Sequence, residues 1–408
     1  MRISSPPAFL VVLTALFAKA DCLSAADWPN WRGPGHDGVS KEAIPSELPA
    51  ELPVLWKARV GTGFSTVSVQ GTRVLTMGNR DDVDIVSCLD ADTGELFWEH
   101  TYPCELDPLY YEGGPGSTPT IHGNSVYTLS KKGHAFRLDL EDGKVLWQRD
   151  LVADHDFALP EWSFACSPFV DRDRLLLNVG RGGLALSRET GETLWMNDTD
   201  TSGYATPVPF SHWKSGTTHL LFSAKSLLGL DSDTGAIAWE FPSRSSRDVN
   251  AADPVVAGDG FVLSSTAGTT LLSLGEDESE PLKVWEQRDL KWYFNSGVLV
   301  DGHLYSLNGT THRPTELACH SVETGELIWS EEGFGSGGLM AAGKVVILFD
   351  LGVLTLFEAT PAGFKPLHRQ KILDGKCWTS PVLSHGRIYC RNAEGELVCV
   401  SLLSDSGE

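Results

Sequence analysis

The chain has 408 residues, and its 54 acidic against 32 basic side chains give a formal net charge of −22 at pH 7. An acidic surface of this size repels phosphate backbones and anionic lipid, so charge argues against nucleic-acid and membrane-surface binding. Glycine occurs 41 times and tryptophan 13 times. Glycine-rich turns that alternate with aromatic-bearing strands are typical of all-β folds.

The first 26 residues have the pattern of a signal peptide. Arg2 gives a positive start, residues 8–18 are apolar except for Thr14, and small residues follow. An apolar run of this length is too short to cross a bilayer, which takes about 20 residues. Cleavage after Ala26 or after Ala20 both suit the pattern. No later stretch is long and apolar enough for a span, so we expect an exported protein in the periplasm or outside the cell.

Residues 27–51 follow as an extended arm that carries Trp28 and Trp31. We expect these two aromatic side chains to anchor the arm against the domain that follows. The alternative is that a partner displaces the arm. Residues 52–408 form the domain itself.

One repeat organises this domain: a strand ending in Leu-Asp, an acidic turn, Thr-Gly, and a strand ending in tryptophan. The clear copies are LDADTGELFW (89–98), LDLEDGKVLW (138–147), LSRETGETLW (186–195), LDSDTGAIAW (230–239) and HSVETGELIW (320–329). Degenerate copies end at Trp285 and His368. The spacing of these ends matches the roughly 40–45 residues that a four-stranded propeller blade needs.

The count of strands predicts both the number of blades and how the ring closes. Eight small-residue segments, such as STPTI at 117–121, open repeats, but only seven complete closing strands follow. The missing closing strand is LPVLWKARV at 52–60, with Trp56 in the expected place. We therefore predict an all-β, eight-bladed propeller of four-stranded antiparallel blades, whose last blade is closed by the N-terminal strand. Closure ties the two ends together and removes unpaired inner edges.

The acidic turn of the repeat superficially resembles a calcium loop. Asp90, Asp92 and Gly94 have part of that spacing, but the glycine is one place early and the twelfth-position glutamate is missing. We interpret the segment as a tight turn in which Gly94 supplies a positive φ.

The eight cysteines do not form an obvious disulfide framework. Cys88, Cys319 and Cys399 occupy the same register of their repeats, which favours packing as small hydrophobic residues. Cys390 and Cys399 are different, because a two-residue turn at 394–395 would place them opposite each other on a hairpin. Either a cross-strand disulfide or two free thiols fits this pair.

The repeat resembles that of the pyrroloquinoline-quinone (PQQ) family of propellers, which includes PQQ-dependent alcohol dehydrogenases and the BamB scaffold. The segment WPNWRGPGHDGVS (28–40) is similar to the N-terminal signature of exported planctomycete propellers described as PQQ-binding-like. The resemblance covers almost the whole mature chain and implies an eight-bladed propeller. The adjacent cysteine pair and the CxxCH motif found in quinoprotein relatives do not occur in this sequence.

In such a blade, the short A–B and C–D turns share one face, and the B–C loops and blade-to-blade connections share the other. The long connections 99–116, 148–165 and 240–252 fall on the second face, which we call the long-loop face and expect to be functional. Residues just before each inner strand should rim a central funnel there, and arginines should enter from the B–C loops. The candidate binding residues are Glu112, Trp162, Arg181, Tyr204, Asn250, Trp292, Asn295, Trp378 and Arg391. The alternative is that the aromatic members only fill a tapering channel.

No catalytic or metal-binding residue is assigned, since the sequence has no HExxH, P-loop or GxSxG motif. The leading hypothesis is a monomeric, non-catalytic scaffold of the cell envelope, similar in type to BamB, that binds an envelope protein or small molecule on the long-loop face. The resemblance also implies an alternative, a PQQ-dependent oxidoreductase. In it, funnel tryptophans would stack PQQ, arginines would hold its carboxylates and calcium would assist.

Overall fold

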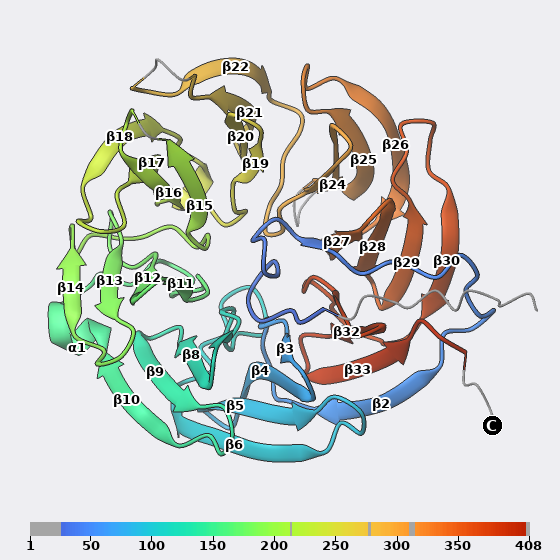
Figure 1. Ribbon diagram of the computed structural model, residues 1–408, viewed down its shortest axis with the longest axis horizontal. Helices are drawn as coiled ribbons and strands as arrows, with labels where there is room; N and C mark the ends of the chain where they lie inside the picture. The colour runs from blue at the N-terminus through green and yellow to red at the C-terminus, as the bar shows by residue number, and fades with distance from the viewer. Residues whose placement is uncertain (1–25, 213, 276–278, 310–314, 405–408) are drawn as a thin grey trace, which may run out of the picture.

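The computed structural model describes residues 26–212, 214–275, 279–309 and 315–404. The expected signal peptide therefore lies outside the described residues, apart from Ala26. Eight antiparallel sheets surround a common axis, seven of them four-stranded and one extended to five strands (Figure 1). Among the described residues the regular secondary structure is β-strand, apart from one short helix, α1 (Leu151–His155), and one 3₁₀ turn, η1 (Ser246–Asp248). The predicted eight-bladed, all-β propeller is confirmed.

The blades follow the chain in order, and each runs from an inner to an outer strand. The first four blades are β3 (Ser68–Gln70), β4 (Arg73–Arg80), β5 (Val83–Asp90), β6 (Leu96–Pro103); β7 (Thr120–His122), β8 (Ser125–Leu129), β9 (His134–Asp139), β10 (Val145–Asp150); β11 (Phe169–Asp171), β12 (Arg174–Leu177), β13 (Leu184–Ser187), β14 (Thr193–Met196); and β15 (Val208–His212), β16 (Thr217–Phe222), β17 (Ser226–Leu230), β18 (Ile237–Pro242).

The second half repeats this order until the ring closes. Its blades are β19 (Val255–Ala257), β20 (Gly260–Ser265), β21 (Gly268–Ser273), β22 (Leu282–Gln287); β23 (Val298–Val300), β24 (His303–Asn308), β25 (Thr315–Ser321), β26 (Leu327–Phe334); β27 (Gly338–Ala342), β28 (Val345–Asp350), β29 (Val353–Glu358), β30 (Pro366–Lys371); and β31 (Val382–Ser384), β32 (Arg387–Arg391), β33 (Glu396–Ser401), β2 (Val54–Arg59). Strand β2 pairs antiparallel with β33, with Trp56 opposite Cys399, which confirms closure of the last blade by the N-terminal strand.

The repeated tryptophan and glycine form a contact between neighbouring blades. Trp98 Nε1 donates to the Leu140 carbonyl of the next blade at 3.1 Å. Gly143 of that blade lies against the same indole, and a Cβ on it would approach the ring to 2.5 Å. Gly94 lies in the same way on Trp56 and has φ +73°. The glycine is therefore required twice, for its positive φ and for the close approach of the ring.

The acidic turn is a tight turn, as the sequence predicted. Asp90 Oδ1 accepts hydrogen bonds from the backbone N–H groups of Asp92 at 2.9 Å and of Thr93 at 2.8 Å. The first carboxylate of the motif thus holds its own turn, in the way that short polar side chains commonly do.

Cys88, Cys319 and Cys399 are buried free thiols, and each lies opposite a repeat tryptophan. Of the two alternatives for Cys390 and Cys399, the structure has the two free thiols and not the disulfide. Cys390 pairs with Val398 and Cys399 pairs with Tyr389, so the two thiols point to opposite faces of the sheet. The reason is turn length.

The turn has three residues between Asn392 and Glu396 and not two. Asn392 N–H donates to the Glu396 carbonyl at 3.0 Å, and Asn392 Oδ1 accepts from the Glu396 N–H at 2.8 Å. The extra residue moves the register by one position, which moves a side chain to the other face.

The N-terminal arm crosses the centre of the ring and closes its short-turn end (the dark-blue segment in Figure 1). Trp28 exchanges backbone hydrogen bonds of 2.9 and 2.8 Å with Val69 in blade 1, and the Ile121 N–H of blade 2 donates to the Pro29 carbonyl at 2.7 Å. Strand β1 (Val39–Ser40) adds in parallel to β27 of blade 7. Residues 26–51 are thus built into the propeller, and the stretch 28–40 acts as a plug.

Two further arm side chains reach the far blades. Trp31 Nε1 donates to Asp253 Oδ2 of blade 5 at 2.5 Å. Arg32, only 6% exposed, donates to the carbonyl of Gly297 in blade 6 at 3.0 Å and to that of Asp37 at 2.7 Å. Because a buried guanidinium must be hydrogen-bonded, Arg32 fixes the plug on the axis.

A chain of hydrogen bonds joins the inner strands at the level just beyond the plug. Thr66 N–H donates to Thr118 Oγ1 at 3.2 Å, and Thr118 N–H donates to Ser167 Oγ at 2.9 Å. Ser167 N–H then donates to Thr206 Oγ1 at 3.0 Å, and Thr206 N–H to Asp253 Oδ1 at 2.7 Å. From blade 1 to blade 5, the polar residue that opens each blade is therefore a link to its neighbour.

Candidate functional site

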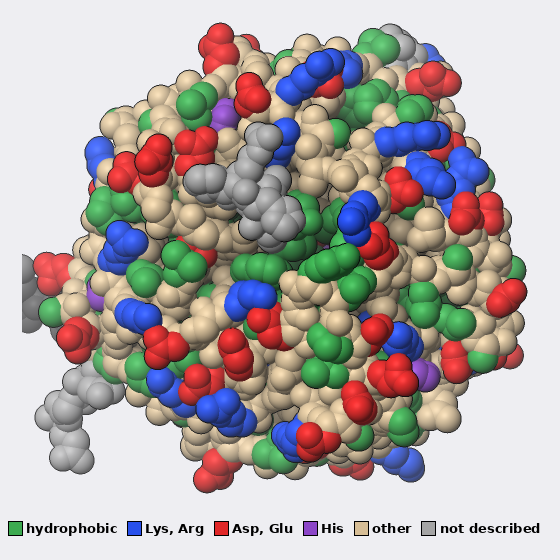
Figure 2. All heavy atoms as spheres, turned by 180° about the vertical axis from the view of Figure 1, so that it is seen from behind, with side chains coloured by type: hydrophobic (Ala, Val, Ile, Leu, Met, Phe, Trp, Pro, Cys, Tyr) green, Lys and Arg blue, Asp and Glu red, His purple; other side chains and the backbone are tan. Residues whose placement is uncertain are grey.

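The long-loop face carries an aromatic cluster at the mouth of the funnel. The Phe64 ring lies 5.6 Å from that of Trp378 and 5.4 Å from that of Tyr111, and the Phe294 ring lies 5.0 Å from that of Trp378. Lys376 Nζ sits 4.4 Å above the Trp378 ring. Hydrophobic side chains gather near the middle of this face (Figure 2). The rings pack on one another, so they narrow the funnel.

The connection between blades 1 and 2 lies over this mouth. Glu112 forms an ion pair with Lys376 of blade 8 at 2.8 Å, and Asp107 pairs with Lys132 of blade 2 at 2.7 Å. Between them Tyr110 is 79% exposed, with φ +64°. The connection is therefore held at both sides while its tip presents an aromatic ring to solvent.

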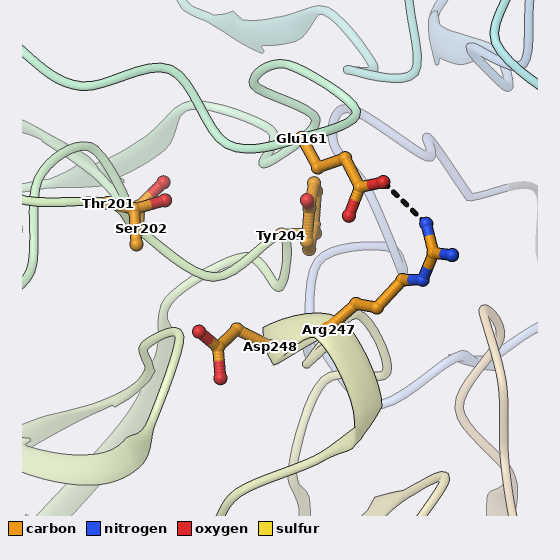
Figure 3. A pocket seen from close by; sticks show the side chains of 6 residues that line it. All are labelled: Glu161, Thr201, Ser202, Tyr204, Arg247 and Asp248. Carbon is orange, nitrogen blue, oxygen red and sulfur yellow. Dashed lines mark hydrogen bonds and ion pairs between the residues drawn. The ribbon is translucent and has the colours of Figure 1, made fainter.

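A pocket of about 340 Å³ opens beside this connection. Three neighbouring blade-to-blade connections supply its walls, namely those that precede blades 3, 4 and 5 (Figure 3). The residues that line it are Glu161, Thr201, Ser202, Tyr204, Arg247 and Asp248. Its volume lies in the range of small-molecule sites, although its lining is more polar than most of them.

Five of the nine sequence candidates lie at the funnel mouth or beside the pocket. Tyr204 lines the pocket, and its hydroxyl accepts from the Trp162 N–H at 3.3 Å, with the two rings 6.3 Å apart. Glu112 and Trp378 belong to the funnel cluster described above. Asn295 Nδ2 donates to the carbonyl of Gly337 and to that of Trp378, at 2.9 and 2.8 Å, and so ties blades 6, 7 and 8 together.

The other four candidates lie elsewhere. Trp292 is fully buried in the core between blades 5 and 6. Asn250 is also fully buried and donates to three carbonyls, while Arg391, 1% exposed, donates to the carbonyls of Ser65, Met77 and Gly61. Arg181 is at the surface in an ion pair with Glu240 at 3.2 Å. These side chains are packed in the core or are bound to other residues of this chain, so the structure does not bring them to the funnel.

Most of the pocket residues are not marked in the sequence. Glu161, Arg247 and Asp248 lie in or beside the long connections that it predicted to be functional, but no motif marks them. Arg247 and Asp248 are consecutive non-glycine residues with positive φ, +58° and +56°. Such left-handed backbone is uncommon outside glycine and cannot be read from the local sequence.

The residues on the axis do not fit PQQ with calcium. The inner end of the channel is filled by the plug, and the cavity between the plug and blades 7 and 8 measures about 10 Å³, room for about one water molecule. The guanidiniums of Arg32 and Arg391 are engaged with backbone carbonyls and are not free for cofactor carboxylates. Within the described residues, no three His, Cys, Asp or Glu side chains group closely enough to hold a metal ion.

Fold and surfaces together define an eight-bladed propeller of the PQQ-repeat type. Among solved structures, BamB from Moraxella catarrhalis matches with a TM-score of 0.65 at 16% identity, over 88% of this chain and 99% of that one. A quinohemoprotein alcohol dehydrogenase from Comamonas testosteroni matches with a TM-score of 0.66 at 13% identity, over 94% of this chain and 82% of that one. At these identities the likeness concerns the fold alone.

The sequence decides the family. The family model described as outer membrane protein assembly factor BamB matches residues 53–152 and 82–331, and the chain belongs to this family. A relative described by the same words, from Yersinia pestis, is 24% identical over 300 residues, which is 68% of this chain and 72% of the relative. Another, from Salmonella typhimurium, is 31% identical over 116 residues, 27% of this chain and 26% of that protein.

Across the part of the chain that the structure describes, no helix has the length and apolar character needed to cross a membrane.

Proposed function

We propose that this protein is a non-catalytic binding scaffold of the bacterial cell envelope, which holds a protein partner on its long-loop face. Residues 1–26 would export it, and residues 27–51 would form the arm, with the plug at 28–40, on the propeller formed by residues 52–408. Membership of the BamB family supports the scaffold role, and the relatives named as outer membrane protein assembly factors support an envelope partner.

One observation carries this proposal. The axial channel is filled by the plug, whereas the long-loop face presents an open pocket and, beside it, exposed Tyr110 and Leu109, 79% and 36% exposed. Exposed aromatic rings at a polar rim are typical of protein interfaces. Tyr110 also has the Arg247 guanidinium 5.9 Å from its ring centre, which holds the ring next to the pocket.

Photo-crosslinking in the native host tests the proposal. A photoreactive amino acid at Tyr110 should give one defined adduct with an envelope protein. A matched probe at Leu327, which is 53% exposed on the outer strand β26, should give none. Equal adducts from both positions, or none from Tyr110, would contradict a partner on this face.

Calorimetric titration with PQQ, with and without calcium, tests the competing activity. The plugged axis predicts no saturable heat from folded protein. Micromolar binding that disappears when Trp162 is replaced by alanine would instead favour a cofactor-dependent oxidoreductase.

A further inference from the structure

The pocket between the connections preceding blades 3, 4 and 5 has two chemically different halves. In the first, Glu161 pairs with Arg247 at 2.7 Å, shown by the dashed line in Figure 3. Arg247 also lies over Tyr110. The charges of Glu161 and Arg247 neutralise each other, so this half of the pocket does not favour a charged ligand.

The second half contains charge and hydrogen-bonding capacity that the described residues leave unused. Asp248 points away from Arg247, toward the side where Thr201 and Ser202 lie (Figure 3). Within the described ranges its carboxylate makes no hydrogen bond or ion pair. Ser202 is only 1% exposed, and its Oγ is buried without a partner. Since a buried hydroxyl left unsatisfied is costly, a ligand that makes a hydrogen bond here is favoured.

The electrostatic surroundings select the sign of that ligand. Burial, and after it the nearby Glu161 and Asp248 carboxylates, raise the pKa of Tyr204 to about 12, so the wall of the pocket is a neutral phenol in a negative field. The whole chain carries a formal charge of −22. A negative pocket on an acidic protein concentrates cations.

The hydrogen-bonding groups and the volume of the pocket indicate which kind of cation fits. An ammonium group has three donors and no acceptor, which matches the Asp248 carboxylate and the hydroxyls of Thr201 and Ser202. A saccharide would need an open aromatic face inside the pocket, but Tyr204, the aromatic ring in the pocket wall, is only 9% exposed. A pocket of about 340 Å³ has room for the end of a lysine side chain and part of its stem.

We propose that this pocket binds the ammonium group of a lysine side chain presented by the partner, with Asp248 as counter-ion and Ser202 and Thr201 as hydrogen-bond acceptors. This assignment rests on the proposed scaffold function and specifies the chemistry of the partner. It predicts a basic residue at the centre of the partner's contact surface.

The test is titration of the full mature chain with the tripeptide acetyl-Gly-Lys-Gly-amide, followed by tryptophan fluorescence and calorimetry. We expect saturable binding that weakens with added salt and is absent for the same peptide with Nε-acetyl-lysine. Asp248→Asn should weaken binding at least about tenfold, and Ser202→Ala by a smaller factor. Asp81→Asn is the matched control, because Asp81 is exposed on the same face and has φ +54° against +56° for Asp248. It should leave binding unchanged.

Equal binding of both peptides, no binding of either, or wild-type affinity in Asp248→Asn would overturn the proposal. Binding of an N-acetylglucosamine oligomer without binding of the lysine peptide would overturn it in favour of a saccharide site. Crosslinking from Tyr110 is an independent measurement. If it still yields an envelope partner when the lysine peptide fails, only the ligand assignment is wrong and the scaffold function stands.

Discussion

Replacing Arg32 by alanine should destabilise the whole propeller, although the residue lies outside every blade. The Arg32 guanidinium is buried and donates to the carbonyls of Asp37 and Gly297 and, at 3.4 Å, to that of Ser296. It also offsets the charge of Asp253, which burial shifts to a pKa of about 6. Its removal leaves these carbonyls without their donor and the buried Asp253 without a nearby positive charge, and we expect the two losses together to cost about 3–5 kcal/mol. We expect a loss of that size in the free energy of unfolding.

Urea denaturation followed by tryptophan fluorescence measures this loss, and limited proteolysis reports whether residues 26–42 become accessible to cleavage. Arg59→Ala is the control, because the Arg59 side chain is 73% exposed and its ion pair with Glu396 is 3.9 Å long. That variant should lose less than about 1 kcal/mol. If Arg32→Ala matches the control in stability and in protease resistance, then the plug is not part of the cooperative fold and the reasoning fails.

Three further predictions follow from the packing. Gly94→Ala should cost about 1–3 kcal/mol in urea denaturation, because its Cβ would lie 2.6 Å from an indole ring, and Gly71→Ala, also at positive φ but with no atom within 4 Å, should cost less. Burial lowers the pKa of both His36 and His219 to about 4. The free energy of unfolding therefore has its full value above about pH 6.5. It decreases as the pH falls toward 4, by about 2 kcal/mol per histidine at pH 5, because these histidines take up protons more readily in the unfolded chain. His219→Gln should reduce the loss in the free energy of unfolding between pH 7 and 5. An unchanged pH profile would contradict the role of His219 in this loss. Finally, the chain lacking residues 1–25, denatured without reductant, should show seven reactive thiols, whereas five would indicate a disulfide.

The fold could be predicted from the sequence because its information is local and repeated. Each blade carries its own tight turn, its own tryptophan and its own small opening strand, and the spacing of these features alone gives the number of blades. The surplus closing strand at Trp56 also revealed how the ring closes, since an outer strand without its blade has to pair elsewhere.

The position of the plug came only from the tertiary structure. The sequence marked Trp28 and Trp31 as anchors, but the contact between Trp31 and Asp253 joins residues 222 positions apart. No local pattern identifies Asp253 as its acceptor. The register of Cys390 was likewise decided by one extra turn residue, which periodicity does not resolve.

The candidate site shows the same division. The sequence predicted which face carries the long connections, and the pocket lies there, with Tyr204 in its wall. It could not predict that Trp292, before an inner strand, and Arg391, at a B–C loop, turn into the core, because neither position determines the direction of the side chain. Asp248 and Ser202 come together only after three consecutive blades have assembled. A repeating sequence determines the ring, because each blade repeats the same local interactions, whereas the plug and the pocket depend on single contacts between distant segments.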